Sequence, residues 1–217
     1  MLKFNFKERK EDCIRILCMG AHSDDIEIGC GGSILRLLTE YKDVEVHWIV
    51  LGSSGQRNKE AISSAKKFLK NAKNINIIIN NFKDSFFPYN GGEIKRFFEK
   101  IKKKVSPDIV FTHYRHDLHQ DHRLVSELTW NTFRNHLILE YEIIKYDGDI
   151  GVPNFFIHLE DRICQNKISI IMDSFKTQRG KDWFTSEVLY SILRLRGMES
   201  RAPENYAEGF YCRKFVF

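Results

Sequence analysis

The sequence predicts an α/β fold built on a doubly wound, mostly parallel sheet. Short apolar runs alternate with segments of helical periodicity through the first two thirds of the 217 residues. Repeating units of this length connect parallel strands by right-handed crossovers. No Pro/Gly-rich linker, internal repeat or low-complexity tract interrupts them, so residues 1–217 are expected to form a single domain.

Each expected strand is a short apolar run, and each expected helix repeats apolar residues every three or four positions. The parallel strands are expected at 14–19, 44–51, 75–79, 108–112 and 142–146. The helices between them are expected at 33–41, 59–71, 91–104 and 121–135. After Pro153 the pattern changes and predicts C-terminal additions: a strand at 155–160, helices at 167–178 and 186–195, and a last strand at 210–216.

Two compact groups of imidazoles and carboxylates each follow an expected strand. Ala21-His22-Ser23-Asp24-Asp25 follows the strand at 14–19, and His119-Gln120-Asp121-His122 follows the strand at 108–112. In a Rossmann-like strand order near 3-2-1-4-5, these two strands are neighbours, and ligands bind outside their carboxyl ends. We therefore expect the two groups to meet in one site.

The two groups contain a ligand set for a catalytic divalent metal ion. His22 and Asp25 are three residues apart where a helix begins, a spacing that turns both side chains toward one point. A catalytic zinc ion has three protein ligands and an open position for water, and His122 is the natural third ligand. Such a set also accepts Fe(II) or another divalent ion.

The remaining side chains supply the parts of metal-assisted hydrolysis. Asp24 can act as general base toward a water molecule. His119, three residues from His122, can stabilise an oxyanion and protonate a leaving amine. Asp121 can hydrogen-bond one of the imidazoles and fix its tautomer.

Simpler interpretations stay open for single residues. Asp24 or Asp25 could merely cap the helix, because Asp is a favoured N-cap. Three histidines could equally be loop residues: His113, His116 and His119. The nearby glycines match neither the dinucleotide-binding nor the P-loop pattern, so we expect them to allow close approach of the backbone. These are Gly29, Gly31 and Gly32.

Composition and charge exclude several classes of function. The formal net charge is +5 without a basic arm or nucleic-acid motif, so we expect no nucleic-acid partner but a mild preference for anionic ligands. The five cysteines are scattered and include no CxxC pair, which argues against a disulfide framework. Residues 1–12 contain no signal-like apolar run, and no stretch approaches the ~20 apolar residues of a membrane span. We expect a cytoplasmic protein.

These segments resemble those of the LmbE-like, PIG-L type zinc-dependent N-deacetylases. The first motif of that family is Ala-His-Pro-Asp-Asp followed by Gly-Gly, and residues 21–25 with residues 31–32 stand in its place, with Ser23 for the usual proline. The second motif is His-x-Asp-His, here residues 119–122 preceded by Asp117. Residues 52–60 and 206–210 match two weaker family features. The resemblance therefore covers nearly the whole chain.

The resemblance implies a role for each residue of the two groups. The implied roles are zinc binding by His22, Asp25 and His122, general-base catalysis by Asp24, assistance to the oxyanion and leaving group by His119, and orientation of a histidine by Asp121. Ser23 carries none of these roles, so we expect the site to tolerate the change from proline.

The resemblance also implies a substrate class. The family removes N-acetyl groups, typically from amino sugars or sugar conjugates. Arg57 is expected to bind substrate oxygens, unless it forms a salt bridge with Glu60 or is merely a charge at the start of a helix. Tyr89 is expected at the substrate-binding rim. A hydrolase of another N-acyl amide and a non-catalytic carbohydrate- or nucleotide-binding module are the alternatives. A homo-oligomer is compatible with the sequence.

Overall fold

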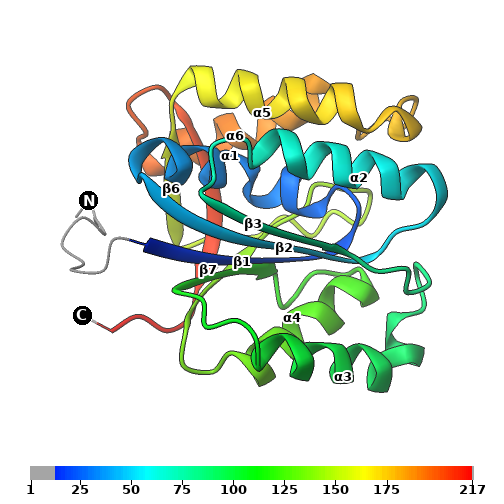
Figure 1. Ribbon diagram of the computed structural model, residues 1–217. Helices are drawn as coiled ribbons and strands as arrows, with labels where there is room; N and C mark the ends of the chain where they lie inside the picture. Colours follow the sequence, from blue (N-terminus) through cyan, green and yellow to red (C-terminus); the bar gives the residue numbers. More distant parts are fainter. Residues whose placement is uncertain (1–12, 217) are drawn as a thin grey trace.

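The sheet has the expected strand order, extended by two C-terminal strands. The computed structural model describes residues 13–216, so residues 1–12, in which no export signal was expected, lie outside the described range. Within that range a seven-stranded sheet has the order β3-β2-β1-β4-β5-β7-β6 (Figure 1). The bounds are β1 Cys13–His22, β2 Asp43–Gly52, β3 Asn74–Ile79, β4 Ile109–His113, β5 Leu137–Tyr141, β6 Phe155–Leu159 and β7 Tyr206–Cys212. The first five strands are parallel and β7 is antiparallel to both its neighbours, which confirms the predicted fold class.

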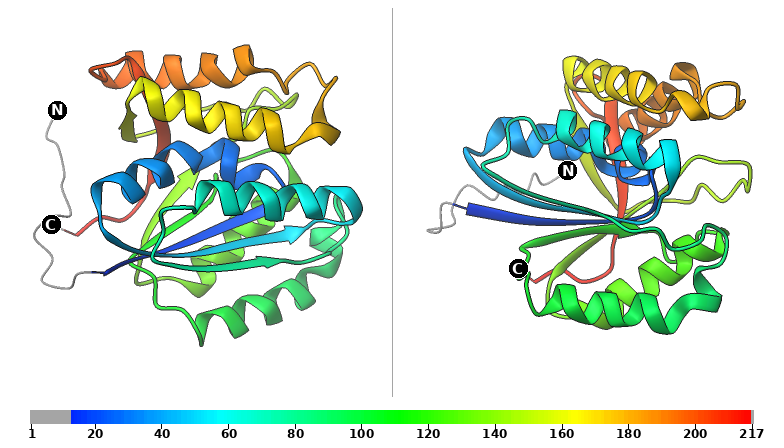
Figure 2. Two further views of the ribbon diagram at one scale, coloured as in Figure 1. Left: turned by 45° about the horizontal axis from the view of Figure 1, so that its top comes forward. Right: turned by 45° about the vertical axis from the view of Figure 1, so that its right-hand side comes forward.

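Helices cover both faces of this sheet. Figures 1 and 2 show α3 and α4 on one face, with α1, α2, α5 and α6 on the other. The bounds are α1 Asp25–Glu40, α2 Gly55–Phe68, α3 Gly91–Lys102, α4 Gln120–Thr132, α5 Asp161–Ser174 and α6 Ser186–Ser200, with short 3-10 helices η1 Phe87–Asn90 and η2 Lys176–Gln178. None of the helices found in residues 13–216 has the length and apolar character needed to cross a bilayer.

Alternation along the central strand divides the core between the two faces. Ile16 and Cys18 of β1 belong to the apolar cluster under α1 and α2, whereas Leu17 and Met19 belong to the cluster under α3. All four side chains are fully buried. A strand segment covered on both faces is apolar on both faces, and for this reason the central strand β1 contains a continuous apolar run in the sequence.

Helix α1 begins at Asp25, eight residues before the expected start at Ser33. The first two turns of α1 contain glycines, which are poor helix formers and for this reason were not expected in a helix. These glycines pack against neighbours that leave no space for a side chain. A Cβ at Gly29 would overlap the ring of Tyr141, and one at Gly31 would lie 2.7 Å from Phe68. The expected close backbone approach is therefore present, and tertiary packing outweighs the low helix propensity of glycine.

Three other expected elements were displaced along the chain. The strand expected at 142–146 lies at Leu137–Tyr141, the helix expected at 167–178 begins at Asp161, and the last strand ends at Cys212. The displaced strand contains a fully buried acid, Glu140, whose charge is met by Arg213 at 2.7 Å. A charged residue inside a strand interrupts the apolar run, so a search for continuous apolar runs does not find the strand.

Replacement of Gly29 by alanine is expected to destabilise the fold by about 1–3 kcal/mol, the usual cost of overpacking. The neighbouring Tyr141 ring cannot move freely, because its hydroxyl donates to the carbonyl of Met19 at 2.7 Å. Urea denaturation measures the change. Gly92→Ala in α3 is the control, since a Cβ there meets only the end of Arg96 at 3.8 Å. Equal stabilities for the two variants would contradict the packing argument.

Candidate metal centre and active site

The two polar groups meet at the carboxyl ends of β1 and β4, which are neighbours in the sheet. His22 is the last residue of β1, and Asp24 and Asp25 begin the turn into α1. His119 is the N-cap of α4, and His122 lies in its first turn. The predicted meeting of the two segments at the switch point of the sheet is present in the structure.

Three atoms of the predicted ligands form a compact triangle. His22 Nδ1 lies 3.2 Å from His122 Nε2 and 3.5 Å from Asp25 Oδ2, and the third side, from His122 Nε2 to Asp25 Oδ2, is 3.6 Å. Ligands bonded tetrahedrally to zinc at 2.0–2.2 Å are about 3.3–3.6 Å apart. The donor set and its spacing therefore fit one divalent ion.

A carboxylate supports the second nitrogen of each imidazole in this triangle. His122 Nδ1 lies 3.0 Å from Asp117 Oδ2, and His22 Nε2 lies 3.2 Å from Asp121 Oδ2. Carboxylates that hold the outer nitrogen of a ligand histidine fix its tautomer and raise its basicity. Asp121 thus lies where an orienting residue was expected, with His22 as its partner.

The surroundings shift the pKa values of the two ligand imidazoles in opposite directions. Burial acts to lower the pKa of His22, but hydrogen bonds to Asp121, Asp25 and Asp84 outweigh it and raise that pKa well above its ordinary value. Burial and the neighbouring His113 lower the pKa of His122 to about 4, so this imidazole is neutral at pH 7. A neutral imidazole is the form that binds a metal ion.

His113 lies in the candidate site, although the sequence left open that it was merely a loop histidine. It is the last residue of β4 and is fully buried, with Nε2 3.1 Å from Asp25 Oδ2. Its ring stacks on His122 with centroids 3.9 Å apart, and these three residues could also share an ion. The signal for its burial was its position directly after Phe111 and Thr112 in an apolar run. His116, in contrast, is exposed in the following loop.

Asp24 presents one free carboxylate oxygen. Oδ1 accepts a hydrogen bond from Arg57 at 2.8 Å, whereas Oδ2 is buried and has no hydrogen-bond partner within residues 13–216. Burial raises the pKa of Asp24 against the opposing effect of Arg57. Its side chain makes no capping bond to α1. Asp24 is therefore a desolvated carboxylate with an oxygen available to accept a proton.

Asp24 is the ion-pair partner of Arg57 in the structure. Arg57 lies in the first turn of α2 and pairs with Asp24 instead of Glu60. Glu60 accepts hydrogen bonds from the backbone and hydroxyl of Thr177. The nearby Ser23 hydroxyl donates to Ser53 at 2.8 Å, so the residue that replaces the family's proline links the first group to the loop after β2.

His119 stands beside the ligand triangle. Its ring centroid lies 4.9 Å from that of His22 and 4.6 Å from that of His122. Its Nδ1 accepts a hydrogen bond from the Asp121 amide at 3.2 Å, which assigns the ring proton to Nε2. Burial and the neighbouring His22 lower the pKa of His119.

Tyr89 is the one predicted site residue that lies apart from the cluster. Its side chain is 79% exposed and its ring lies 5.8 Å from that of Phe86. The loop that carries it is tied to the centre, because the amides of Ser85 and Phe87 donate to Asp121 at 2.7 and 3.1 Å. Tyr89 thus lies on a loop anchored to the site without itself reaching the ligands.

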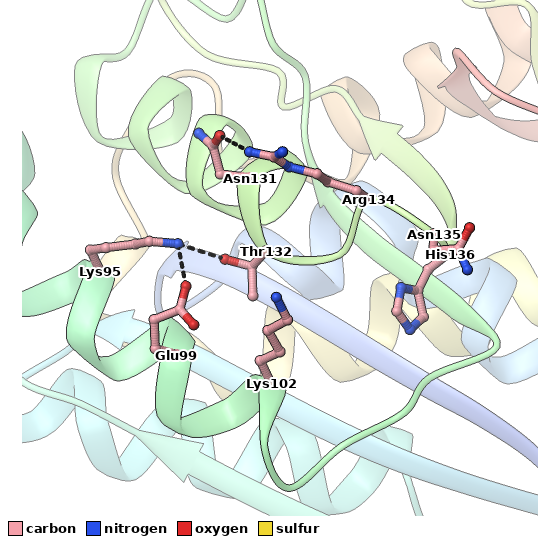
Figure 3. A pocket seen from close by; sticks show the side chains of 8 residues that line it. All are labelled: Lys95, Glu99, Lys102, Asn131, Thr132, Arg134, Asn135 and His136. Atoms are coloured by element: carbon pink, nitrogen blue, oxygen red, sulfur yellow. Dashed lines mark hydrogen bonds and ion pairs between the residues drawn. The ribbon is translucent and has the colours of Figure 1, made fainter.

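A cavity of about 520 Å³ lies elsewhere, between α3 and the end of α4 (Figure 3). Its lining residues are Lys95, Glu99, Lys102, Asn131, Thr132, Arg134, Asn135 and His136. None of the residues in the two polar groups lines it. The location of the candidate site therefore follows from side-chain geometry and not from the size of a pocket.

Comparison with known proteins identifies relatives of this arrangement. A curated relative, the uncharacterized deacetylase YaiS of Escherichia coli (strain K12), is 32% identical over 120 residues, which are 51% of this chain and 63% of that protein. The chain thus matches less than two thirds of that relative's length.

Solved structures share the fold at lower identity. The N,N'-diacetylchitobiose deacetylase from Pyrococcus horikoshii superposes with a TM-score of 0.69 at 24% identity, covering 95% of this chain and 85% of that one. The zinc-inhibited form of teicoplanin deacetylase Orf2 superposes with a TM-score of 0.71 at 14% identity, and the match covers 91% of this chain and 97% of that one. GalB, the 4-carboxy-2-hydroxymuconate hydratase from Pseudomonas putida KT2440, has a TM-score of 0.68 at 15% identity, and the match covers 94% of this chain and 98% of that one.

The family described as "PIG-L: GlcNAc-PI de-N-acetylase" matches residues 17–133, a range that includes both polar groups, Arg57 and Tyr89. This match covers more than half of the 217 residues. The resemblance of the two motifs is confirmed, and the chain belongs to the PIG-L (LmbE-like) family.

Proposed function

We propose that this protein is a zinc-dependent hydrolase that removes the N-acetyl group from an amino sugar or a sugar conjugate. One observation carries the proposal: a triangle of donor atoms with the spacing of metal ligands lies beside a buried carboxylate that has a free oxygen. Binding alone would need no such carboxylate. The names of the deacetylases among its relatives support the choice of an N-acetyl substrate.

In this proposal His22, Asp25 and His122 hold the metal, and Asp24 is the general base. A divalent ion in such a site lowers the pKa of water and polarises a carbonyl oxygen. Arg57 occupies Oδ1 of Asp24 and leaves Oδ2 to accept the proton of the attacking water. Because burial raises the pKa of Asp24, this carboxylate is a stronger base than an exposed one.

His119 stabilises the negative charge that develops on the carbonyl oxygen. With Nδ1 engaged by the Asp121 amide, the imidazole offers its Nε2–H as a hydrogen-bond donor. The lowered pKa of His119 disfavours the imidazolium, the form that His119 would need in order to protonate the leaving amine as expected from the sequence. We therefore assign the proton of the leaving amine to Asp24, which returns the proton it took from water. One water and one amide give acetate and an amine.

Arg57 and Tyr89 are the residues that we propose for substrate binding. Arg57 is 30% exposed at its side chain and can contact hydroxyl or anionic groups of a sugar conjugate from its place beside Asp24. Tyr89 is assigned to the outer rim, where an aromatic ring can pack on a sugar face. A cytoplasmic location, a mild preference for anionic substrates and iron as a substitute metal accompany the proposal as expectations from the sequence.

The hydratase GalB shares the fold, so the fold alone does not select deacetylation. The decisive experiment incubates the protein, loaded with zinc after treatment with a chelator, with a panel of N-acetylated amino sugars and conjugates. The proposal expects free acetate and a primary amine in equal amounts, and none from the metal-free protein. A panel that varies the acyl group separates the N-acetyl substrate from other amides. Binding of sugars without any turnover would favour a binding module instead.

Asp24→Asn is expected to retain the metal and to lose about 2–4 kcal/mol of transition-state stabilisation, or about 30- to 900-fold in kcat/KM. The amide cannot accept the proton from water, although it preserves the size of the side chain. Acetate release, normalised to metal content, measures the effect. Turnover like that of the unmodified protein at equal metal content would remove Asp24 from the role of base.

His122→Ala is expected to lose bound zinc, because it removes one corner of the donor triangle and leaves only two ligands. Elemental analysis after dialysis measures the occupancy. His136→Ala is the control, since His136 is an imidazole that lines the separate cavity. Full zinc occupancy in the His122 variant would show that the ligand assignment is wrong.

A further inference from the structure

The loop between β5 and β6 reaches across to the turn that precedes His122. Lys145 Nζ lies 3.1 Å from Asp117 Oδ2 and 2.6 Å from Asp149 Oδ1. The three side chains are largely buried, with exposed fractions of 11% for Lys145, 2% for Asp117 and 7% for Asp149. This ion-pair triad, formed by Lys145, Asp117 and Asp149, is shielded from water and from salt, in contrast to an ordinary surface pair.

Asp117, the member of the triad nearest the candidate site, also contacts two residues of that site. Its Oδ2 lies 3.0 Å from His122 Nδ1, and its Oδ1 accepts the backbone N–H of His119 at 2.8 Å. Asp149 adds a second tie, because its Oδ2 accepts the Leu118 N–H at 2.7 Å. The turn from 117 to 119 is thus fixed by a loop that belongs to neither polar group.

The loop itself is anchored to α6. The guanidinium of Arg196 makes two hydrogen bonds to Glu142, at 2.6 and 2.8 Å, and a third to the carbonyl of Gly151 at 2.9 Å. Glu142 and Gly151 lie on either side of Lys145 and Asp149 in the chain. Arg196 therefore holds both ends of the segment that presents the triad.

We propose that Lys145 and Asp149 are positioning residues for the metal centre, acting through Asp117 on His122. The inference rests on the proposed function, in which His122 is a metal ligand. Asp117 and Asp149 are two buried anions, and without the ammonium group between them they would repel each other at high cost. Relief of that repulsion would move the 117–119 turn and release His122 from the ring orientation in which Nε2 faces the other two ligands.

The experiment compares zinc affinities and cobalt spectra. Lys145→Met keeps the length of the side chain, removes its charge and exposes the two carboxylates to their mutual repulsion. Asp149→Asn acts differently, because it removes the ion pair that orients Lys145 and weakens the acceptor of the Leu118 N–H. Zinc dissociation constants come from competition with a chromophoric chelator, and visible absorption of the cobalt-substituted protein reports ligand geometry. Both variants are expected to bind zinc about 10- to 100-fold more weakly, the range found when outer partners of metal ligands are removed. Both are also expected to change the cobalt spectrum.

Two further variants separate positioning from general stability. Lys95→Met breaks a more exposed lysine–carboxylate pair, with Glu99 at 2.5 Å, that lines the separate cavity (Figure 3), and it should leave zinc affinity unchanged. Lys145→Arg keeps the positive charge and should restore most of the affinity. If Lys145→Met and Asp149→Asn lower the thermal midpoint yet bind zinc and cobalt as the unmodified protein does, the triad is merely structural and the inference is wrong. If the unmodified protein binds no zinc, the proposed function itself fails, which distinguishes the two.

Discussion

The parallel pairing of β1 with β4 is the constraint on which the candidate site depends. His22 and His122 are 100 positions apart in sequence, yet their ring nitrogens lie within 3.2 Å. The pairing of Cys18 with Phe111 aligns the two strands so that the residues after each one emerge at the same edge of the sheet. A strand order that parted β1 from β4 would separate the two polar groups, and neither group alone contains the three proposed ligands.

The C-terminal third of the chain holds both groups in place. Glu208 of β7 accepts the backbone N–H groups of Gly32 and Ser33 in α1 at 2.8 and 2.7 Å, and Lys167 of α5 pairs with it at 2.6 Å. Lys167 also donates to the carbonyl of Ile28. These buried contacts fix the helix that begins directly after Asp24.

A second set of contacts from the same region, centred on Arg196 and Lys145, reaches the turn before His122. Buried ion pairs stabilise a fold weakly, since desolvation offsets much of the attraction between the charges. Their value here is that they define geometry. The antiparallel additions to the sheet are therefore part of the site's support, although they contribute no proposed ligand.

The sequence predicted the two polar groups and their meeting because both depend on local pattern and on strand order. It could not predict which carboxylate faces which nitrogen, since this depends on how α1 and α4 sit against the sheet. The pairing of Arg57 with Asp24 was unforeseen for this reason. The role of Lys145 was concealed by a wrong expectation, which placed residues 142–146 in a strand, whereas the strand ends at Tyr141. The buried Glu140 masked the true strand, and the glycines of α1 masked its first two turns.

The measurement that most directly tests the account is anomalous X-ray scattering at the zinc absorption edge from crystals of the zinc-loaded protein. The account predicts a single strong peak within bonding distance of His22 Nδ1, Asp25 Oδ2 and His122 Nε2, with the Asp24 carboxylate beside it and not bonded to it. A peak held instead by Asp25, His113 and His122, or no peak near the ends of β1 and β4, would contradict it.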